Sequence, residues 1–453
     1  MTAEPLLDRA RELALAYLAT LPDRPVRAAG EAEALLGPLP AAGEDPVAVL
    51  NALAAGAEPG LVASAGPRYF GFVTGGALPI AVAAEWLSSA WDQNAGLHVM
   101  SPAAAAAEQA VAGWLRELLG LPASASAGFV TGAQTANLTA LAAARHGVLE
   151  RAGWDVERDG LQGAPRVRVL AGEEAHVTVF NALRLLGLGT GTVESVPADG
   201  QGRMRADALG EALARGAGAP TIVCAQAGNV NTGAFDPLKE IVAACRERGA
   251  WCHVDGAFGL WAAAAPGRAH LTAGAGAADS WAVDAHKWLN VPYDSAFAFV
   301  AHPEAHTAAM RLTAAYLTTA GPTERNGADW VPEASRRARV FPVWAALRFL
   351  GRHGVADLVE RCCALASRMA ARLDAHARAA VLNDVVLNQV LLRIDDDDAA
   401  TDATVRRVQE DGTCWLGGTR WHGRAAMRIS VSGWATTEED ADRSVDAILR
   451  AID

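Results

Sequence analysis

The sequence predicts an α/β protein with a mainly parallel central sheet and a smaller C-terminal α+β domain. Short apolar segments alternate with longer helical patterns through the middle of the chain, at 128–132, 167–172, 221–226, 251–256 and 280–288. Apolar runs of this length that lead into helices are typical of β-α units whose strands are buried on both faces. Such a sheet binds its ligand outside the carboxyl ends of the strands. Functional residues are therefore expected there.

Three regions of different character follow from this pattern. Residues 1–95 are expected to form helices and loops, and residues 96–310 the large α/β domain that binds the ligand. Residues 311–453 are expected to form the smaller domain, in which a long helical region precedes two strands, at 388–394 and 426–432.

The composition excludes several classes of protein. With 51% hydrophobic and 20% charged residues among 453, the chain is not disordered. A formal net charge of −12 argues against binding to nucleic acid or to an anionic membrane surface. No apolar run reaches the ~18–20 residues of a membrane span, and the acidic N-terminus does not resemble a secretory signal. The six cysteines form no CxxC pair, so we expect reduced thiols and a cytoplasmic location.

Lysine is almost absent. Of the 39 basic residues only Lys239 and Lys287 are lysines, and the others are arginines. Arginine stays protonated, whereas a desolvated lysine can lose its proton and act as a nucleophile. Lys239 lies at the polar start of an amphipathic helical segment and is expected on the surface. Lys287 is the candidate for amine chemistry.

Polar residues follow the predicted strands in a specific pattern. Asp255 ends one strand, residues 284–287 (Asp-Ala-His-Lys) end another, His176 opens a helix, and residues 131–137 form a small-residue turn into a helix. Each has an ordinary structural explanation when taken alone. Together they offer helix N–H groups for a phosphate, a carboxylate for a pyridine nitrogen, an imidazole to stack on a ring and a lysine to form an imine. Pyridoxal 5′-phosphate needs all of these.

Longer segments carry a family resemblance: PRYFGF (67–72), SPAAAAAEQ (101–109), EEAHVTVFNALRLLGLG (173–189), HVDGAFG (253–259) and DAHKWLNVPYDS (284–295). On these segments the chain resembles the group II pyridoxal-phosphate-dependent decarboxylases, the family of aromatic-amino-acid and glutamate decarboxylases. The resemblance implies the aspartate-aminotransferase-like fold, fold type I of the pyridoxal-phosphate-dependent transferases. It also implies a symmetric homodimer and a small-molecule amino-acid substrate.

The resemblance also implies roles for individual residues. Lys287 would be the Schiff-base lysine, Asp255 the partner of the pyridine nitrogen, and His176 the ring that stacks on the cofactor. The N–H groups of Ala133 and Gln134 would contact the phosphate.

Further roles are implied around the cofactor and the substrate. His286 would help to hold the phosphate, and Asn231 lies near the family's contact to the phenolic oxygen. Arg428 resembles an arginine that turns toward a substrate carboxylate. Tyr69 and Phe70 resemble a substrate-facing segment, with core packing as the alternative.

The reaction implied by the resemblance is decarboxylation of an amino acid. Many aromatic-amino-acid decarboxylases carry a loop tyrosine that delivers a proton, but Gly327 stands at its position here and Tyr316 is the only tyrosine nearby. Another pyridoxal-phosphate reaction therefore stays open: transamination, aldol cleavage or decarboxylation with oxidative deamination. A non-catalytic binding protein is a further alternative. Which amino acid is the substrate is left open.

No metal site is expected. The spacing of His and Cys does not fit a zinc site. His253 and Asp255 are expected to point to opposite faces of their strand, which excludes them as joint metal ligands.

Overall fold

The computed structural model describes residues 2–314, 321 and 324–453. It divides into two compact units, each built from segments far apart in the sequence. Unit 1 comprises Met1–Thr74, Ser367–Leu382 and Val390–Asp453. Unit 2 comprises Gly75–Ala366 and Asn383–Gln389.

Unit 2 is built on a seven-stranded sheet with the strand order β1-β7-β6-β5-β4-β2-β3. The five strands from β6 to β3 in this order pair in parallel, whereas β7 pairs antiparallel with both β6 and β1. The predicted mainly parallel sheet is therefore confirmed. The strands are β1 (Ser126–Val130), β2 (Arg168–Gly172), β3 (Glu194–Val196), β4 (Thr221–Gln226), β5 (Trp251–Asp255), β6 (Ser280–Asp284) and β7 (Ala296–Val300).

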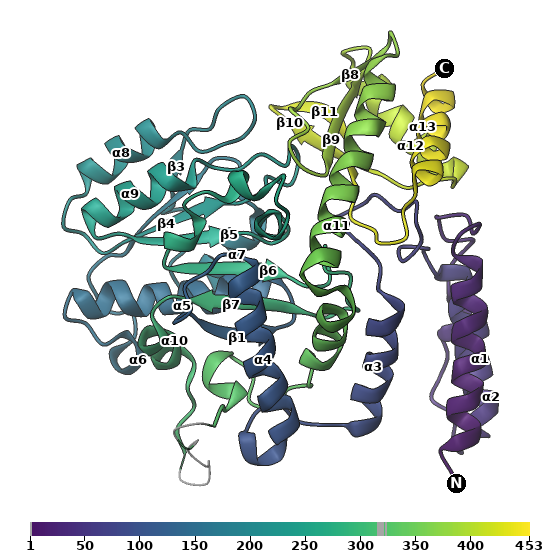
Figure 1. Cartoon of the computed structure of the whole chain (residues 1–453), viewed down its shortest axis with the longest axis horizontal. Helices are drawn as coiled ribbons and strands as arrows, with labels where there is room; N and C mark the ends of the chain where they lie inside the picture. The colour runs from purple at the N-terminus through teal and green to yellow at the C-terminus, as the bar shows by residue number, and fades with distance from the viewer. Residues whose placement is uncertain (1, 315–320, 322–323) are drawn as a thin grey trace. The chain divides into compact units, whose positions relative to one another are not determined.

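Helices cover both faces of this sheet (Figure 1). Its strands are therefore buried on both sides and consist mainly of apolar residues. Every residue of β1, β4, β5, β6 and β7 is buried. Helices α5 and α7 lie on one face and α8 and α9 on the other, as right-handed crossovers require. The helices of unit 2 are α3 (Pro79–Trp91), α4 (Pro102–Leu118), α5 (Ala133–Arg151), α6 (Val156–Asp159), α7 (Val177–Leu185), α8 (Ala206–Arg215), α9 (Leu238–Arg248) and α10 (Pro303–Met310).

Unit 1 contains a four-stranded sheet with the order β10-β11-β9-β8, together with helices, so the predicted α+β character of the C-terminal region is confirmed. The two predicted strands correspond to β9 and β11. Its elements are α1 (Glu4–Thr20), α2 (Pro46–Ala57), β8 (Ala379–Val381), β9 (Gln389–Ile394), α12 (Asp398–Asp411), β10 (Gly417–Trp421), β11 (Arg424–Ser430) and α13 (Glu438–Ile452). Most of helix α11 (Val340–Asp374) belongs to unit 2, and Gly351, whose φ of 59° few other residues adopt, interrupts it there.

A buried charge cluster holds the segment that contains Arg325 and Arg336 against helix α4. Glu108 of α4 accepts hydrogen bonds from Arg325 (3.0 Å) and from Arg336 (2.6 Å). Arg336 also donates to the carbonyl groups of Ala95 and Phe129, both at 2.8–2.9 Å. One carboxylate thus compensates two guanidinium groups that are almost shielded from water.

Glu108→Gln should lower the free energy of unfolding by about 3–5 kcal/mol, because two buried cations lose their counter-charge. Denaturant unfolding measures the loss. Glu117→Gln is the matched control on the same helix, since Glu117 pairs with Arg352 at an exposed site, and it should cost under about 0.5 kcal/mol. Equal small losses in both variants would show that the cluster contributes nothing.

Candidate active site

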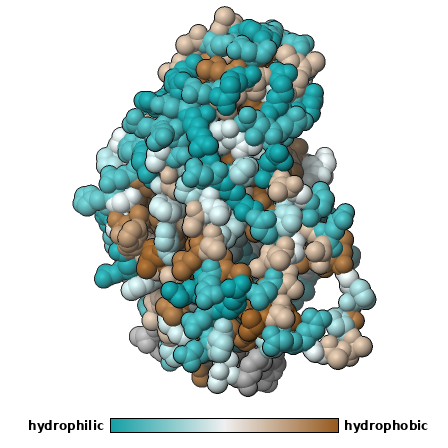
Figure 2. Space-filling view, turned by 90° about the vertical axis from the view of Figure 1, so that its right-hand side faces the viewer, coloured by the Kyte–Doolittle hydropathy of each residue, from teal (hydrophilic) through white to brown (hydrophobic). Residues whose placement is uncertain are grey.

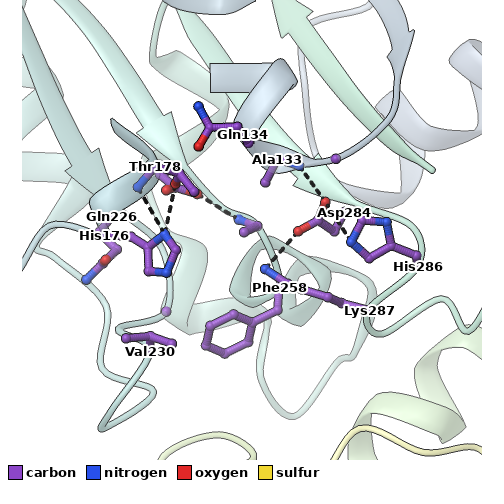
Figure 3. A pocket seen from close by; sticks show the side chains of 14 residues that line it. Ala133, Gln134, His176, Thr178, Gln226, Val230, Phe258, Asp284, His286 and Lys287 are labelled. Carbon is purple, nitrogen blue, oxygen red and sulfur yellow. Dashed lines mark hydrogen bonds and ion pairs between the residues drawn. The ribbon is translucent and has the colours of Figure 1, made fainter. Parts of the chain in front are cut away.

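The carboxyl ends of β4, β5 and β6 and the N-termini of α5 and α7 surround a cavity of about 260 Å³ in unit 2 (Figure 3). This is the edge of the sheet where the sequence predicts the ligand. The residues that line it are Gly132, Ala133, Gln134, His176, Thr178, Gln226, Gly228, Val230, Asp255, Ala257, Phe258, Asp284, His286 and Lys287.

Six of the predicted site residues are brought together here: Ala133, Gln134, His176, Asp255, His286 and Lys287. Asn231 does not line the cavity, and its neighbour Val230 does. Asn231 is buried in the loop after β4, where its N–H donates to Asn229 Oδ1 at 2.8 Å.

Tyr69, Phe70 and Arg428 belong to unit 1, where they lie in one region. The Tyr69 ring stacks on Trp415 at 5.0 Å, and the Phe70 N–H donates to the Trp415 carbonyl. The Phe70 carbonyl accepts from Ser430, two residues after Arg428 on β11. Phe70 is only 1% exposed, as core packing requires.

Lys287 points at a carboxylate. Its Nζ lies 2.8 Å from Asp284 Oδ2, and both side chains line the cavity (Figure 3). Burial alone would lower the pKa of Lys287, but the charge of Asp284 and its hydrogen bond outweigh burial and raise the pKa above its usual value. Lys287 is therefore a charged ammonium group in this arrangement.

Asp284 is the functional side chain that the sequence reasoning missed. It is the last residue of β6 and is 1% exposed. Its Oδ1 accepts from the Ala133 N–H at 2.6 Å, at the start of α5, and lies 3.4 Å from His286 Nε2. The spacing Asp-x-x-Lys within 284–287 was a signal available in the sequence, whereas the contact to Ala133 joins residues 151 positions apart.

His286 is held in a neutral form. Its Nδ1 accepts from the Ser295 N–H at 3.2 Å, and burial lowers the pKa of the ring. The remaining ring nitrogen therefore carries the hydrogen, and it faces Asp284.

Asp255 ends β5, lines the cavity and is 4% exposed. Its Oδ1 accepts from the Ala257 N–H at 3.1 Å and its Oδ2 from Asn137 Nδ2 at 3.2 Å. His176 caps the N-terminus of α7, and its Nδ1 lies 2.8 Å from Thr178 Oγ1.

The prediction that His253 and Asp255 face opposite sides of their strand was wrong. Side chains two residues apart on a strand share a face, and the side chain of Asn137 contacts both. Among the described residues, no group of three or more His, Cys, Asp and Glu side chains is arranged to hold a metal ion.

Gly327 begins a short 3₁₀ helix and is buried. A Cβ atom there would collide with the Ala95 carbonyl and with the Arg336 side chain. This position therefore has no room for a tyrosine in the present packing. Tyr316 lies outside the described residues.

Residues 38–395 match the pyridoxal-dependent decarboxylase conserved domain. The chain belongs to the pyridoxal-dependent decarboxylase family. It is 28% identical to an aromatic-L-amino-acid decarboxylase of Bacillus atrophaeus over 82% of this chain and 78% of that one. It is also 28% identical to the 4-hydroxyphenylacetaldehyde synthase of Rhodiola rosea, over 96% and 91%. The crystal structure of Oryza sativa TDC with PLP and tryptamine has the same fold, with a TM-score of 0.92, 23% identity and coverage of 99% and 97%.

The family is a family of amino-acid carboxy-lyases, and its cofactor is pyridoxal 5′-phosphate. The residues of the cavity fit this group. Gln134 Nε2 is buried and has no hydrogen-bond partner among the described residues, next to helix N–H groups that have no partner within α5. A carboxylate, an imidazole and a lysine complete the set that the sequence predicted. No helix in the described part of the chain has the length and apolar character needed to cross a membrane.

In the protein freed of cofactor, Asp284→Asn should lower the pKa of Lys287, because burial would then oppose the ammonium charge without the compensating carboxylate. Amines react only when neutral, so the midpoint of the pH–rate profile for modification by trinitrobenzenesulfonate should move about one pH unit or more downward. Peptide mapping assigns the label, and exposed Lys239 is an internal control whose profile should stay in place. An unmoved Lys287 midpoint would mean that Asp284 does not govern this amine.

Proposed function

We propose that this decarboxylase acts on an L-amino acid with an aromatic side chain and releases the amine and carbon dioxide. One observation carries the proposal: Lys287, Asp255, His176 and the N-terminus of α5 converge on a single cavity. The aromatic substrate class is supported by the relative from Bacillus atrophaeus and by the apolar side chains of Phe258 and Val230 in the cavity wall.

Each polar group of the cavity has a proposed task. When bound, pyridoxal 5′-phosphate supplies the electron sink for the pair left by the broken bond to the carboxyl carbon. Asp255 keeps the pyridine nitrogen protonated, because an opposite charge favours the protonated form of a nearby base. His176 packs against the ring face, and Lys287 binds the cofactor covalently.

The phosphate is assigned to the N-terminus of α5. Gln134 offers a buried side-chain NH₂ group that lacks a partner in the described part of the chain, and His286 lies beside the same helix end through its contact with Asp284. A helix N-terminus stabilises an anion through its free N–H groups and its dipole. Asn231 stays a predicted contact to the phenolic oxygen.

The substrate carboxylate is assigned to Arg428 on β11. Burial lowers the pKa of this guanidinium, and no described carboxylate forms an ion pair with it. Arg428 is partly buried, and a desolvated cation without a counter-charge favours binding of an anionic ligand. Tyr69 stays a proposed substrate contact, whereas the burial of Phe70 supports its core-packing alternative.

A second reaction is decarboxylation with oxidative deamination to an aldehyde, in which dioxygen is the oxidant, water supplies the carbonyl oxygen and ammonia leaves. One observation favours it. Carbon protonation after loss of carbon dioxide needs a positioned acid, and Gly327 has neither an acid nor room for one. The Rhodiola rosea relative, an aldehyde synthase by name, matches almost the whole chain.

A homodimer is the proposed assembly. None of the residues of α1 is buried, and its Leu7, Leu15 and Leu18 are exposed together with Val49 and Leu53 of α2. Figure 2, a view of one face, shows brown hydrophobic patches among the hydrophilic surface. Such apolar surface suits burial against a second copy. The six cysteines are buried and form no disulfide in the described part of the chain, which supports the proposed cytoplasmic location.

Reduction with borohydride should fix pyridoxal 5′-phosphate on Lys287, because this lysine lies in the cavity and Lys239 is exposed on α9. Peptide mass mapping locates the adduct. Lys287→Arg should abolish it and Lys239→Arg should not. An adduct on Lys239, or none after reconstitution, would falsify the assignment of Lys287.

Aromatic L-amino acids should yield amine and carbon dioxide as the main products, with a measurable fraction of carbonyl product. The missing acid at Gly327 is the physical reason for the side reaction. Amino acids labelled at the carboxyl carbon, assayed for carbon dioxide, amine and aldehyde, measure the partition. Retention of the label in every product would contradict decarboxylation, and activity limited to acidic amino acids would contradict the aromatic class.

A further inference from the structure

A chain of buried polar side chains runs behind Asp255, away from the cavity. Trp251 Nε1 lies 2.9 Å from Ser280 Oγ, which lies 2.9 Å from His253 Nδ1. His253 Nε2 lies 2.9 Å from Asn137 Oδ1, and Asn137 Nδ2 lies 3.2 Å from Asp255 Oδ2. All five residues are at most 4% exposed, so water does not compete for these bonds.

The chemistry of the groups fixes the direction of every hydrogen bond. An indole N–H only donates and a carboxylate only accepts, so Ser280 Oγ accepts from Trp251, and Asn137 turns its NH₂ group to Asp255 and its oxygen to His253. The His253 ring must then donate from Nε2, and its Nδ1 accepts the hydrogen of Ser280 Oγ. Burial lowers the pKa of His253 to about 4, in keeping with a neutral ring.

The orientation of the Asn137 amide follows from this order. With its oxygen on the His253 N–H, its NH₂ group faces the Asp255 carboxylate. The flipped amide would set two donors against each other at His253 and two acceptors at Asp255. This chain of hydrogen bonds from Trp251 to Asp255, called the relay below, therefore directs the NH₂ group of Asn137 at the Asp255 carboxylate.

The same NH₂ group reaches the second cofactor-facing residue. Asn137 Nδ2 lies 3.2 Å from Thr178 Oγ1, which lies 2.8 Å from His176 Nδ1. Asn137 is also four residues after Ala133 on α5, so both lie on one face of the helix. One helix thus presents its N-terminus to the cavity and this amide to Asp255 and Thr178, two residues that line it.

We propose that Asn137, held by His253, is a positioning residue that orients the Asp255 carboxylate toward the pyridine nitrogen of the cofactor and stabilises its negative charge. The inference rests on the proposed role of Asp255. Among the described residues, the side-chain NH₂ group of Asn137 and the backbone N–H of Ala257 donate to this carboxylate. Donors to a buried carboxylate stabilise its charged form, which in turn keeps the pyridine nitrogen protonated.

The test uses pyridoxal 5′-phosphate labelled with nitrogen-15 in the ring, bound to the full-length protein at one fixed pH. The nitrogen-15 chemical shift of the bound ring reports its protonation. In Asn137→Leu the shift should move toward the unprotonated value, and kcat should fall by about ten- to a hundredfold with KM little changed, because a hydrogen bond to a charged group is lost.

Two further variants separate positioning from mere stability. Asn137→Thr keeps an acceptor for His253 and a donor for Asp255, and should restore most of the shift and of kcat. Asn383→Leu removes a buried amide that donates to the Thr232 carbonyl at 2.8 Å, outside the relay, and should leave the nitrogen-15 shift at its wild-type value.

His253→Phe removes the donor to Asn137 Oδ1 and should move the shift in the same direction by a smaller amount. This variant decides the question if Asn137→Leu does not fold. A wild-type shift and kcat in Asn137→Leu, or an equal change in Asn383→Leu, would overturn the inference and leave the proposed function intact. Failure of the wild-type protein to bind the labelled cofactor would overturn both.

Discussion

The two central strands of the large sheet are buried along their whole length, so a charged side chain fits only where each strand ends. Asp255 ends β5 and Asp284 ends the adjacent parallel strand β6. Each carboxylate is compensated in a different way. Asp284 has a full counter-charge in Lys287 and the N–H of Ala133, whereas Asp255 has two neutral donors, from Ala257 and Asn137. Asp284 is therefore paired with Lys287, whereas Asp255 stays available to the cationic pyridine ring that we propose it to bind.

Helix α5 supplies one hydrogen-bond donor to each of these two carboxylates. Its first N–H contacts Asp284, and the amide of Asn137, one turn later, contacts Asp255. The helix packs against β4, β5, β6 and β7, so its position relative to the two strand ends is set by the core of the sheet. The site is thus held by burial of apolar side chains, and the polar contacts have only to complete a geometry that the core already defines.

Much of this could be predicted from the sequence, because the informative signals are local. Apolar runs with a polar residue at the end gave Asp255, and the near absence of lysine singled out Lys287. What could not be predicted depends on contacts between distant residues. Asp284 meets Ala133 across 151 positions, and Asn137 meets His253 across 116. The prediction for His253 was wrong for a simpler reason. Side chains alternate from one residue to the next along a strand, so His253 and Asp255, two residues apart, lie on the same face and not on opposite faces. The packing of Gly327 against Ala95 and Arg336 likewise becomes visible only in three dimensions.

The proposed decarboxylation ends with the transfer of a proton to the substrate carbon, and the groups described above decide which residue can deliver it. Of the described groups in the cavity wall, Lys287 and His176 are those that can deliver a hydrogen to substrate carbon, since His286 directs its N–H to Asp284. The Thr178 N–H donates to His176 Nδ1, so a neutral His176 ring carries its hydrogen on the other nitrogen. The carboxylate of Asp284 raises the pKa of Lys287 against the effect of burial and so favours its protonated form. In the proposed reaction, the balance between amine and aldehyde is expected to depend on how firmly Asp284 and Thr178 hold these two donors, because Gly327 has no side chain that could deliver a proton.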